Sequence, residues 1–160
     1  MKELVFMRHG TPLSIQESGS AGDAGRKLAP DGKTQIELSA RRLKQLGFSP
    51  GVIISSPYVR AVQTADIASG FFPAAKRVSE PVLATPLSLT AILDAIDSDA
   101  GGAASVLVIG HQPTLSSLSG RLLGTASPYF TTGSFAYLKL SGGIGSEKAD
   151  LAEFFAPERF

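Results

Sequence analysis

The chain contains two histidines, and each follows an apolar segment of the kind that forms a buried strand. His9 follows residues 4–7 through Arg8, and His111 follows residues 105–109 through a single glycine. A guanidinium group can donate a fork of hydrogen bonds to a tetrahedral oxyanion. A neutral imidazole can attack phosphorus in line and hold the phosphoryl group covalently. These residue types in this pattern therefore indicate chemistry on a phosphoryl group.

The elements that must position these side chains alternate between strands and helices. Short runs of Val, Ile and Leu are typical of strands covered on both faces. Strands are predicted over residues 4–7, 52–54, 77–83, 105–109, 134–140 and 149–155. Helices are predicted over residues 31–47, 57–70, 88–97 and 112–124, where apolar residues recur at helical spacing. This order predicts an α/β fold with a mostly parallel sheet and the final hairpin at one edge.

Parallel strands place their carboxyl ends at one edge of the sheet, and ligands bind there. Arg60 comes shortly after the second predicted strand, residues 52–54. If the three strands are neighbours, Arg8, His9, Arg60 and His111 meet in one pocket although they lie far apart in the sequence. The sequence therefore predicts a pocket with two arginines and two imidazoles at this edge.

The segments around the expected pocket carry further local signals. Ser56 and Pro57 predict an N-cap and the first residue of a helix, and Pro113 predicts the start of another helix. Helix N-termini at this edge would add free N–H groups for an anion. Residues 11–30 are rich in Gly, Ser, Ala and Asp without any period, and we interpret them as a long functional loop in which Asp23 faces solvent.

Composition excludes several other classes of protein. The 160 residues include 15 Lys and Arg against 14 Asp and Glu, a net charge of +1 that argues against a nucleic-acid partner. There is no Cys, which excludes disulfides and thiolate metal sites. Apolar residues make up 43%, enough for a core, and we expect a single domain over residues 1–160. Without a signal-peptide core or a membrane-length apolar stretch, we expect a cytoplasmic protein with no membrane partner, and a monomer.

Three segments resemble, in order, the signatures of the histidine phosphatase superfamily, which includes phosphoglycerate mutases and acid phosphatases. They are MRHGT at residues 7–11, SSPYVRAVQTA at residues 55–65 and VIGHQP at residues 108–113. The short chain, the G-H-Q-P form and the R-x-L-x-x-x-G element at residues 26–32 resemble the SixA-type phosphohistidine phosphatases in particular. The match extends from residue 5 to residue 113.

This resemblance implies a phosphoglycerate mutase-like fold, a three-layer α/β/α sandwich, and a set of roles. His9 would be the nucleophile that becomes phosphorylated, while Arg8, Arg60 and His111 would bind the phosphoryl group and stabilise the transition state. The resemblance implies no metal and no cofactor.

Two further expectations concern the same pocket. Arg26 and Thr11 are expected to reach the bound phosphoryl group as well. A zinc site is the competing interpretation of the two histidines, but two imidazoles are too few ligands and adjacent arginines repel a divalent cation.

The resemblance has one departure that bears on the substrate. Larger members carry a carboxylic acid in an inserted segment between the second and third signatures, whereas residues 82–92 contain no carboxylate. An alkoxide leaving group needs a proton, but imidazole is far less basic, with a pKa of about 6.5. We therefore predict phosphohistidine on a phosphorelay-type protein as the substrate. The alternatives are a phosphatase for small phosphorylated metabolites and a catalytically silent phosphoprotein-binding module.

Overall fold

The computed structural model describes residues 1–85, 87–144 and 149–157, and its strands form one mixed sheet. The strands are β1 (Glu3–Arg8), β2 (Val52–Ser55), β3 (Lys76–Ser79), β4 (Ser105–Gly110), β5 (Phe135–Lys139) and β6 (Asp150–Phe155). Their order across the sheet is β3-β2-β4-β1-β5-β6. The first four are parallel, whereas β5 and β6 are antiparallel at one edge. The prediction that the three strands preceding His9, Arg60 and His111 are neighbours is therefore confirmed.

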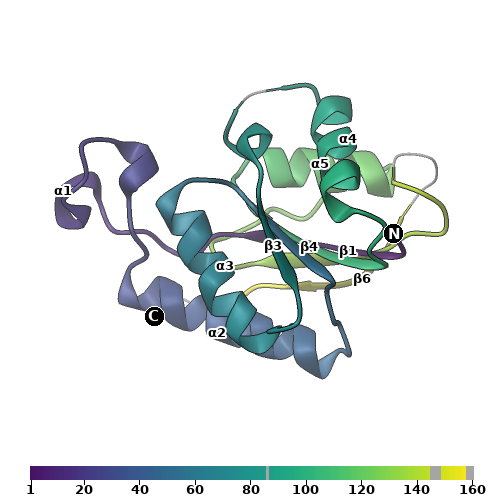
Figure 1. Ribbon diagram of the computed structural model, residues 1–160, viewed down its shortest axis with the longest axis horizontal. Coiled ribbons are helices and arrows are strands. Elements are labelled where there is room, and N and C mark those ends of the chain that lie inside the picture. The colour runs from purple at the N-terminus through teal and green to yellow at the C-terminus, as the bar shows by residue number, and fades with distance from the viewer. Residues whose placement is uncertain (86, 145–148, 158–160) are drawn as a thin grey trace.

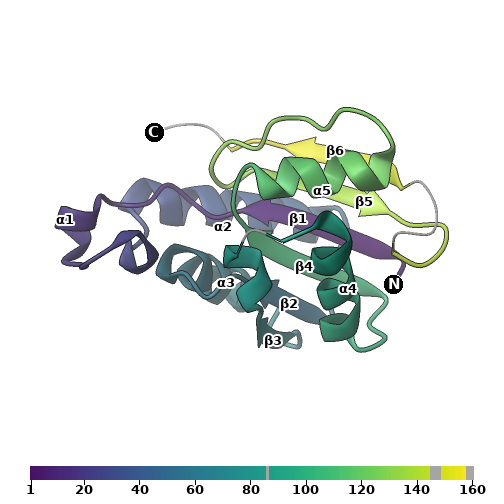
Figure 2. The ribbon, with the colours of Figure 1, turned by 90° about the horizontal axis from the view of Figure 1, so that it is seen from above.

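Helices cover both faces of this sheet. The helical elements are α1 (Ile15–Ser18), η1 (Asp23–Gly25), α2 (Pro30–Gln45), α3 (Val59–Phe71), η2 (Pro81–Ala84), α4 (Leu89–Ala100) and α5 (Thr114–Leu123). Figures 1 and 2 show α2 and α3 on one face and α4 and α5 on the other. The predicted three-layer α/β/α sandwich is confirmed. Among the described residues, no helix is both long and apolar enough to cross a membrane.

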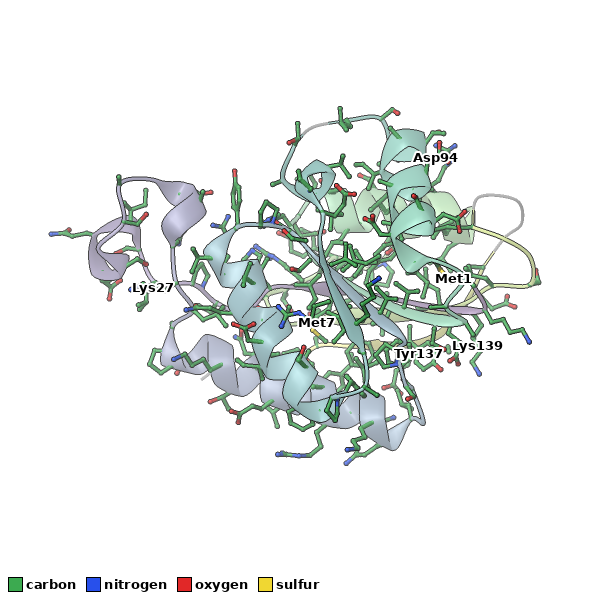
Figure 3. All side chains as sticks on the ribbon, in the orientation of Figure 1. Met1, Met7, Lys27, Asp94, Tyr137 and Lys139 are labelled. Atoms are coloured by element: carbon green, nitrogen blue, oxygen red, sulfur yellow. The ribbon has the colours of Figure 1, made fainter. Side chains whose placement is uncertain are left out.

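The core consists of two layers because each inner strand is apolar on both sides. In β1, Leu4 and Phe6 pack in the cluster that includes α4 and α5, whereas Val5 and Met7 pack in the cluster that includes α2 and α3. All four side chains have 0% exposure, and Met7 lies in the middle of the molecule in Figure 3. Rigid, fully buried strands of this kind hold the residues at their carboxyl ends in fixed positions.

The prediction of a structureless loop over residues 11–30 is wrong. Ser14 begins a capping box with Glu17, in which each side chain accepts a hydrogen bond from the other residue's backbone N–H, and this starts the four-residue helix α1. Pro12 and Leu28 form a bridge at the base of the segment. A helix of one turn is too short to show a period, so only its cap could have revealed it. The segment projects beyond the end of the sheet, as the position of Lys27 in Figure 3 shows.

Two other boundaries differ from the prediction. Helix α3 begins at Val59 with Tyr58 as its N-cap, so the interpretation of Ser56 as a capping residue is wrong. The strand predicted over 77–83 ends at Ser79, because Pro81 starts the 3-10 helix η2 instead. The predicted final hairpin is confirmed in β5 and β6, although part of the Gly-rich turn between them lies outside the described residues.

Candidate active site

The two histidines lie side by side at the carboxyl edge of the sheet. His9 follows β1 and His111 follows β4, and these strands pair residue by residue from Glu3 with Ser105 to Arg8 with Gly110. The ring centroids of His9 and His111 are 5.1 Å apart. Parallel pairing in register therefore brings the two imidazoles together across 102 positions of sequence, as the sequence analysis predicted.

Two hydrogen bonds fix the orientation of the His9 ring and place its lone pair on Nε2. Nδ1 donates a hydrogen bond to the carbonyl oxygen of Gly10 at 2.8 Å, and Nε2 accepts one from Nε of Arg60 at 3.3 Å. His9 is only 4% exposed, and burial lowers its pKa to about 3. The charges of His111, Arg60 and Arg8 add to this lowering, while the bond to Gly10 opposes it. His9 is therefore neutral at pH 7, with Nε2 available as a nucleophile.

Arg60 lies in the first turn of α3 and donates two hydrogen bonds to Asp23, a residue of the projecting segment. Its Nη1 donates to the carbonyl oxygen of Asp23 at 2.8 Å, and its Nη2 donates to Oδ2 of Asp23 at 3.1 Å. The guanidinium also lies over the ring of Tyr58, 5.0 Å from the centroid. Arg60 is 8% exposed, so these partners fix the guanidinium plane beside His9.

The carboxylate of Asp23 joins two arginines and stays ionised. Besides Arg60, it contacts Nη1 of Arg26 at 3.2 Å. Partial burial raises the pKa of Asp23, but hydrogen bonds from Arg60 and Arg26 outweigh this and hold it below its ordinary value. Asp23 therefore carries no proton to donate at neutral pH. Its side chain is 54% exposed, so the prediction that it faces solvent is confirmed, although the same carboxylate also contacts Arg60.

His111 is positioned by a hydrogen bond with Ser56, the residue that follows β2. Its Nε2 lies 2.8 Å from the hydroxyl of Ser56, which also accepts a hydrogen bond from the backbone N–H of Tyr58. Where the Ser56 hydroxyl donates this hydrogen bond to Nε2, the neutral ring of His111 carries its proton on Nδ1. Nδ1 is buried and has no hydrogen-bond partner among the described residues. Burial, then the charge of Arg60, lowers the pKa of His111 to about 4.

Arg8 supplies a second guanidinium from the last position of β1. Its Nη1 donates to the carbonyl oxygen of Phe130 at 3.0 Å, while Nε is buried without a partner in the part of the chain that the structure describes. Burial lowers the pKa of Arg8, the nearby Tyr129 opposes this, and Arg60 adds to the lowering. An arginine remains charged at neutral pH. Arg8 Nε and His111 Nδ1 are thus two buried donors able to serve an anion.

Side chains of α3 and α2 anchor the backbone that follows His9. The N–H of Gly10 donates to the hydroxyl of Thr64, and that hydroxyl donates to the carbonyl of Arg60. Thr11 bonds to Gln35 through its N–H and its hydroxyl. Thr64 lies four residues after Arg60, on the same face of α3. Thr64 is a site residue that was not predicted from the sequence, although its spacing of four residues from Arg60 was a usable signal.

Two glycines allow the end of β1 to touch the start of α2. A Cβ at Gly10 would lie 2.5 Å from the carbonyl oxygen of Gly32, and a Cβ at Gly32 would lie 2.2 Å from that of Thr11. Both distances are too short for any side chain. The glycine of the R-x-L-x-x-x-G element therefore serves close backbone packing beside the site.

The structure gives different positions to the six residues predicted for the site. It brings Arg8, His9, Arg60 and His111 together. Among the described residues, Arg26 is linked to this group through Asp23, while its Nε donates to the carbonyl of Leu13. Thr11 bonds to Thr132 as well as Gln35, which ties the loop to neighbouring segments. That these last two contact a substrate stays a prediction. Among the described residues no three His, Cys, Asp or Glu side chains gather in a way that could hold a metal.

A cavity of about 390 Å³ is lined by His111 and Arg60 of this group. Its walls combine the aromatic ring of Tyr58, the hydroxyl and amide groups of Thr85 and Gln112, and the apolar side chains of Leu83, Ala84 and Pro113. The ring of Tyr58 contacts that of His111 with centroids 5.0 Å apart. The cavity is therefore continuous with the group of basic side chains and has room for the part of a substrate that carries the phosphoryl group.

Comparisons with known proteins agree with this geometry. The family model described as histidine phosphatase superfamily (branch 1) matches residues 4–83. Phosphohistidine phosphatase SixA of Escherichia coli (strain K12) is 30% identical over 145 residues, covering 86% of this chain and 85% of that protein. The mitochondrial serine/threonine-protein phosphatase PGAM5 of Mus musculus is 43% identical over 58 residues, which are 36% of this chain and 20% of that protein. The solved structure of the protein histidine phosphatase SixA complexed with tungstate has a TM-score of 0.82 and 27% identity, covering 97% of both chains.

Fold, site and family model together define the class of protein: the chain belongs to the histidine phosphatase superfamily, and it is a phosphatase. Within that superfamily it is a homologue of SixA, by sequence and by structure over nearly the whole chain.

Proposed function

We propose that this protein is a phosphohistidine phosphatase that works through a covalent phosphohistidine on His9. The observation that carries the proposal is the Nε2 lone pair of His9, set beside the charged fork of Arg60 at 3.3 Å. Two buried donors without partners among the described residues, Arg8 Nε and His111 Nδ1, are the groups that would receive the phosphoryl oxygens. The likeness to SixA supports the same assignment.

In the first step, a bond forms between Nε2 of His9 and phosphorus, and the bond from phosphorus to the substrate's ring nitrogen breaks. The departing imidazole keeps that electron pair, and because its other nitrogen carries a proton it leaves as a neutral ring. The carbonyl oxygen of Gly10, 2.8 Å from Nδ1 of His9, accepts a hydrogen bond that keeps the proton on Nδ1. Phosphorylated His9 is therefore a cationic ring, which makes it a good leaving group in the next step.

In the second step, water attacks phosphorus and the bond from phosphorus to Nε2 of His9 breaks. His9 recovers its lone pair, and both water protons leave with the phosphate monoanion. Arg8, Arg60 and the Nδ1 proton of His111 stabilise the charge on the oxygens in both steps.

The proposed substrate class is supported by the lack of a carboxylic acid proton donor beside His9 in the part of the chain that the structure describes. Asp23 is the carboxylate in contact with Arg60, and its two arginine partners keep it ionised. A leaving group that needs no proton from the enzyme, such as imidazole, suits this site better than an alkoxide. A phosphorylated histidine on a protein such as a phosphotransfer domain is therefore the preferred substrate in this proposal.

The test is a panel of phosphorylated substrates at pH 7.5 with and without chelator. We expect a phosphohistidine protein to be hydrolysed with a higher kcat/KM than a phosphoserine peptide, and chelator to have no effect. Acid-labile label on His9 after rapid quenching would support the covalent step, and His9→Ala should abolish both hydrolysis and labelling. Faster hydrolysis of phosphoserine peptides would contradict the proposed substrate.

A second candidate, a phosphatase for small phosphorylated metabolites, is favoured by the cavity of about 390 Å³ beside His111. A space of this size suits a small organic group. Including small phosphate esters in the same panel separates the two candidates, because a metabolite phosphatase would prefer one of them to the phosphohistidine protein by a wide margin.

A further inference from the structure

The projecting segment between β1 and α2 contributes a contact to the site that the mechanism above does not use. Asp23 is the first residue of η1, and η1 packs against the start of α3. The carbonyl oxygen and Oδ2 of Asp23 contact the two terminal nitrogens of Arg60 at 2.8 Å and 3.1 Å. A largely exposed aspartate therefore contacts a buried arginine through both its backbone and its side chain.

The contact with Asp23 turns one particular edge of the guanidinium toward His9. Asp23 holds the edge formed by Nη1 and Nη2, whereas Nε of Arg60 points at Nε2 of His9. The edge formed by Nε and Nη2 is the one that binds two oxygens of an anion side-on. The same chain uses this edge in Arg42, whose Nε and Nη2 bind the two carboxylate oxygens of Glu153 at 2.7 Å and 2.6 Å.

Asp23 is itself held in place by contacts outside the site. Its carboxylate contacts Arg26, whose Nε donates to the carbonyl of Leu13 at 2.8 Å. Its carbonyl oxygen also accepts the backbone N–H of Arg26. The orientation of Asp23 is thus determined by the folding of the projecting segment, and the orientation of Arg60 by that of Asp23.

We propose that Asp23 is a positioning residue for the phosphoryl site: it holds the outer edge of Arg60 so that the edge formed by Nε and Nη2 faces His9. The inference rests on the proposed phosphoryl-binding role of Arg60. It gives the segment over residues 11–30 a function, because the segment carries the residue that aligns the arginine. Arg26 then acts through Asp23 rather than by touching the substrate.

The experiment compares two variants of equal charge, Asp23→Asn and Asp23→Ala. Both remove the negative charge, but only the asparagine keeps an oxygen that can accept from Nη2 of Arg60. Tungstate binding, measured by titration calorimetry, requires no turnover and reports on the alignment of the site. We expect Asp23→Ala to bind tungstate about tenfold more weakly than Asp23→Asn, which corresponds to about 1.4 kcal/mol. We expect a similar ratio in kcat for p-nitrophenyl phosphate.

Asp66 provides the matched control. It is an aspartate with 60% side-chain exposure, compared with 54% for Asp23, and it pairs with Arg77 at 3.0 Å outside the site. Asp66→Asn and Asp66→Ala should bind tungstate equally. Equal binding by the two Asp23 variants overturns the inference, as does the same difference in the Asp66 pair. If the Asp23 variants differ as expected while phosphohistidine is not hydrolysed, the positioning role stands and the proposed substrate falls.

Discussion

The two buried histidines should make this protein sensitive to acid well above the range where most carboxylates titrate. The pKa of His9 is lowered to about 3 and that of His111 to about 4, mainly because both rings are buried. In the unfolded chain both have a pKa of about 6.5. Between these values the unfolded state binds more protons than the folded state, so stability falls as the pH falls below 6.5.

The magnitude follows from linkage. On going from pH 7 to pH 5, each histidine should lower the free energy of unfolding by about 2 kcal/mol, or about 4 kcal/mol for both. Asp99 acts in the opposite direction, because burial and then Glu80 raise its pKa to about 6. Protonation of Asp99 in the folded state should return about 1 kcal/mol over the same interval. A net loss of about 3 kcal/mol is a large share of the stability of a small protein.

The assay is urea unfolding followed by circular dichroism at pH 7 and pH 5, for the wild type and for His9→Asn and His111→Asn. Each variant should lose about 2 kcal/mol less than the wild type between the two pH values. The contribution of Asp99 is common to all three proteins and cancels in this comparison. Because the chain has only two histidines, their ring protons can also be titrated by NMR. If both variants lose as much stability as the wild type, or if either ring titrates near pH 6.5, the reasoning from burial is refuted.

Three further predictions concern single contacts. Gly32→Ala should lower the free energy of unfolding by about 2 kcal/mol in urea titrations, because its Cβ would lie 2.2 Å from the carbonyl oxygen of Thr11. A loss below about 0.5 kcal/mol would mean that the two backbone segments separate easily. Ser56→Ala should lower kcat about tenfold or more, because Nε2 of His111 loses its hydrogen-bond donor. Nitrogen NMR should show a changed tautomer of His111. An unchanged tautomer would contradict the assigned role of Ser56. Asp99→Asn should stabilise the protein by about 2 kcal/mol more at pH 7.5 than near pH 4, since a raised carboxyl pKa costs stability only above the unfolded value. Urea titrations at both pH values check this, and an equal gain at pH 4 would rule out titration as the cause.

The sequence alone was sufficient for the main architecture. Continuous apolar runs separated by helical periods indicate buried parallel strands, because a strand covered on both faces must be apolar on both sides. The carboxyl ends of such strands share one edge, so the order of residues in the chain predicts that His9 and His111 meet. Their ring centroids are 5.1 Å apart. Signals of this kind are local, since each depends on a few neighbouring residues and on the geometry of a single sheet.

Partnerships between side chains from different elements depended on the tertiary structure. Asp23 and Arg60 are 37 positions apart, and their contact depends on the fold of the projecting segment, which no hydrophobic period in the sequence predicts. Ser56 carries the signal of a helix cap, yet its hydroxyl contacts His111 because α3 begins three residues later. The low pKa of His9 likewise arises from burial among packed elements, with nearby charges adding to it. Local patterns fix which elements form, whereas the partner and protonation state of each polar group depend on what the packed elements place beside it.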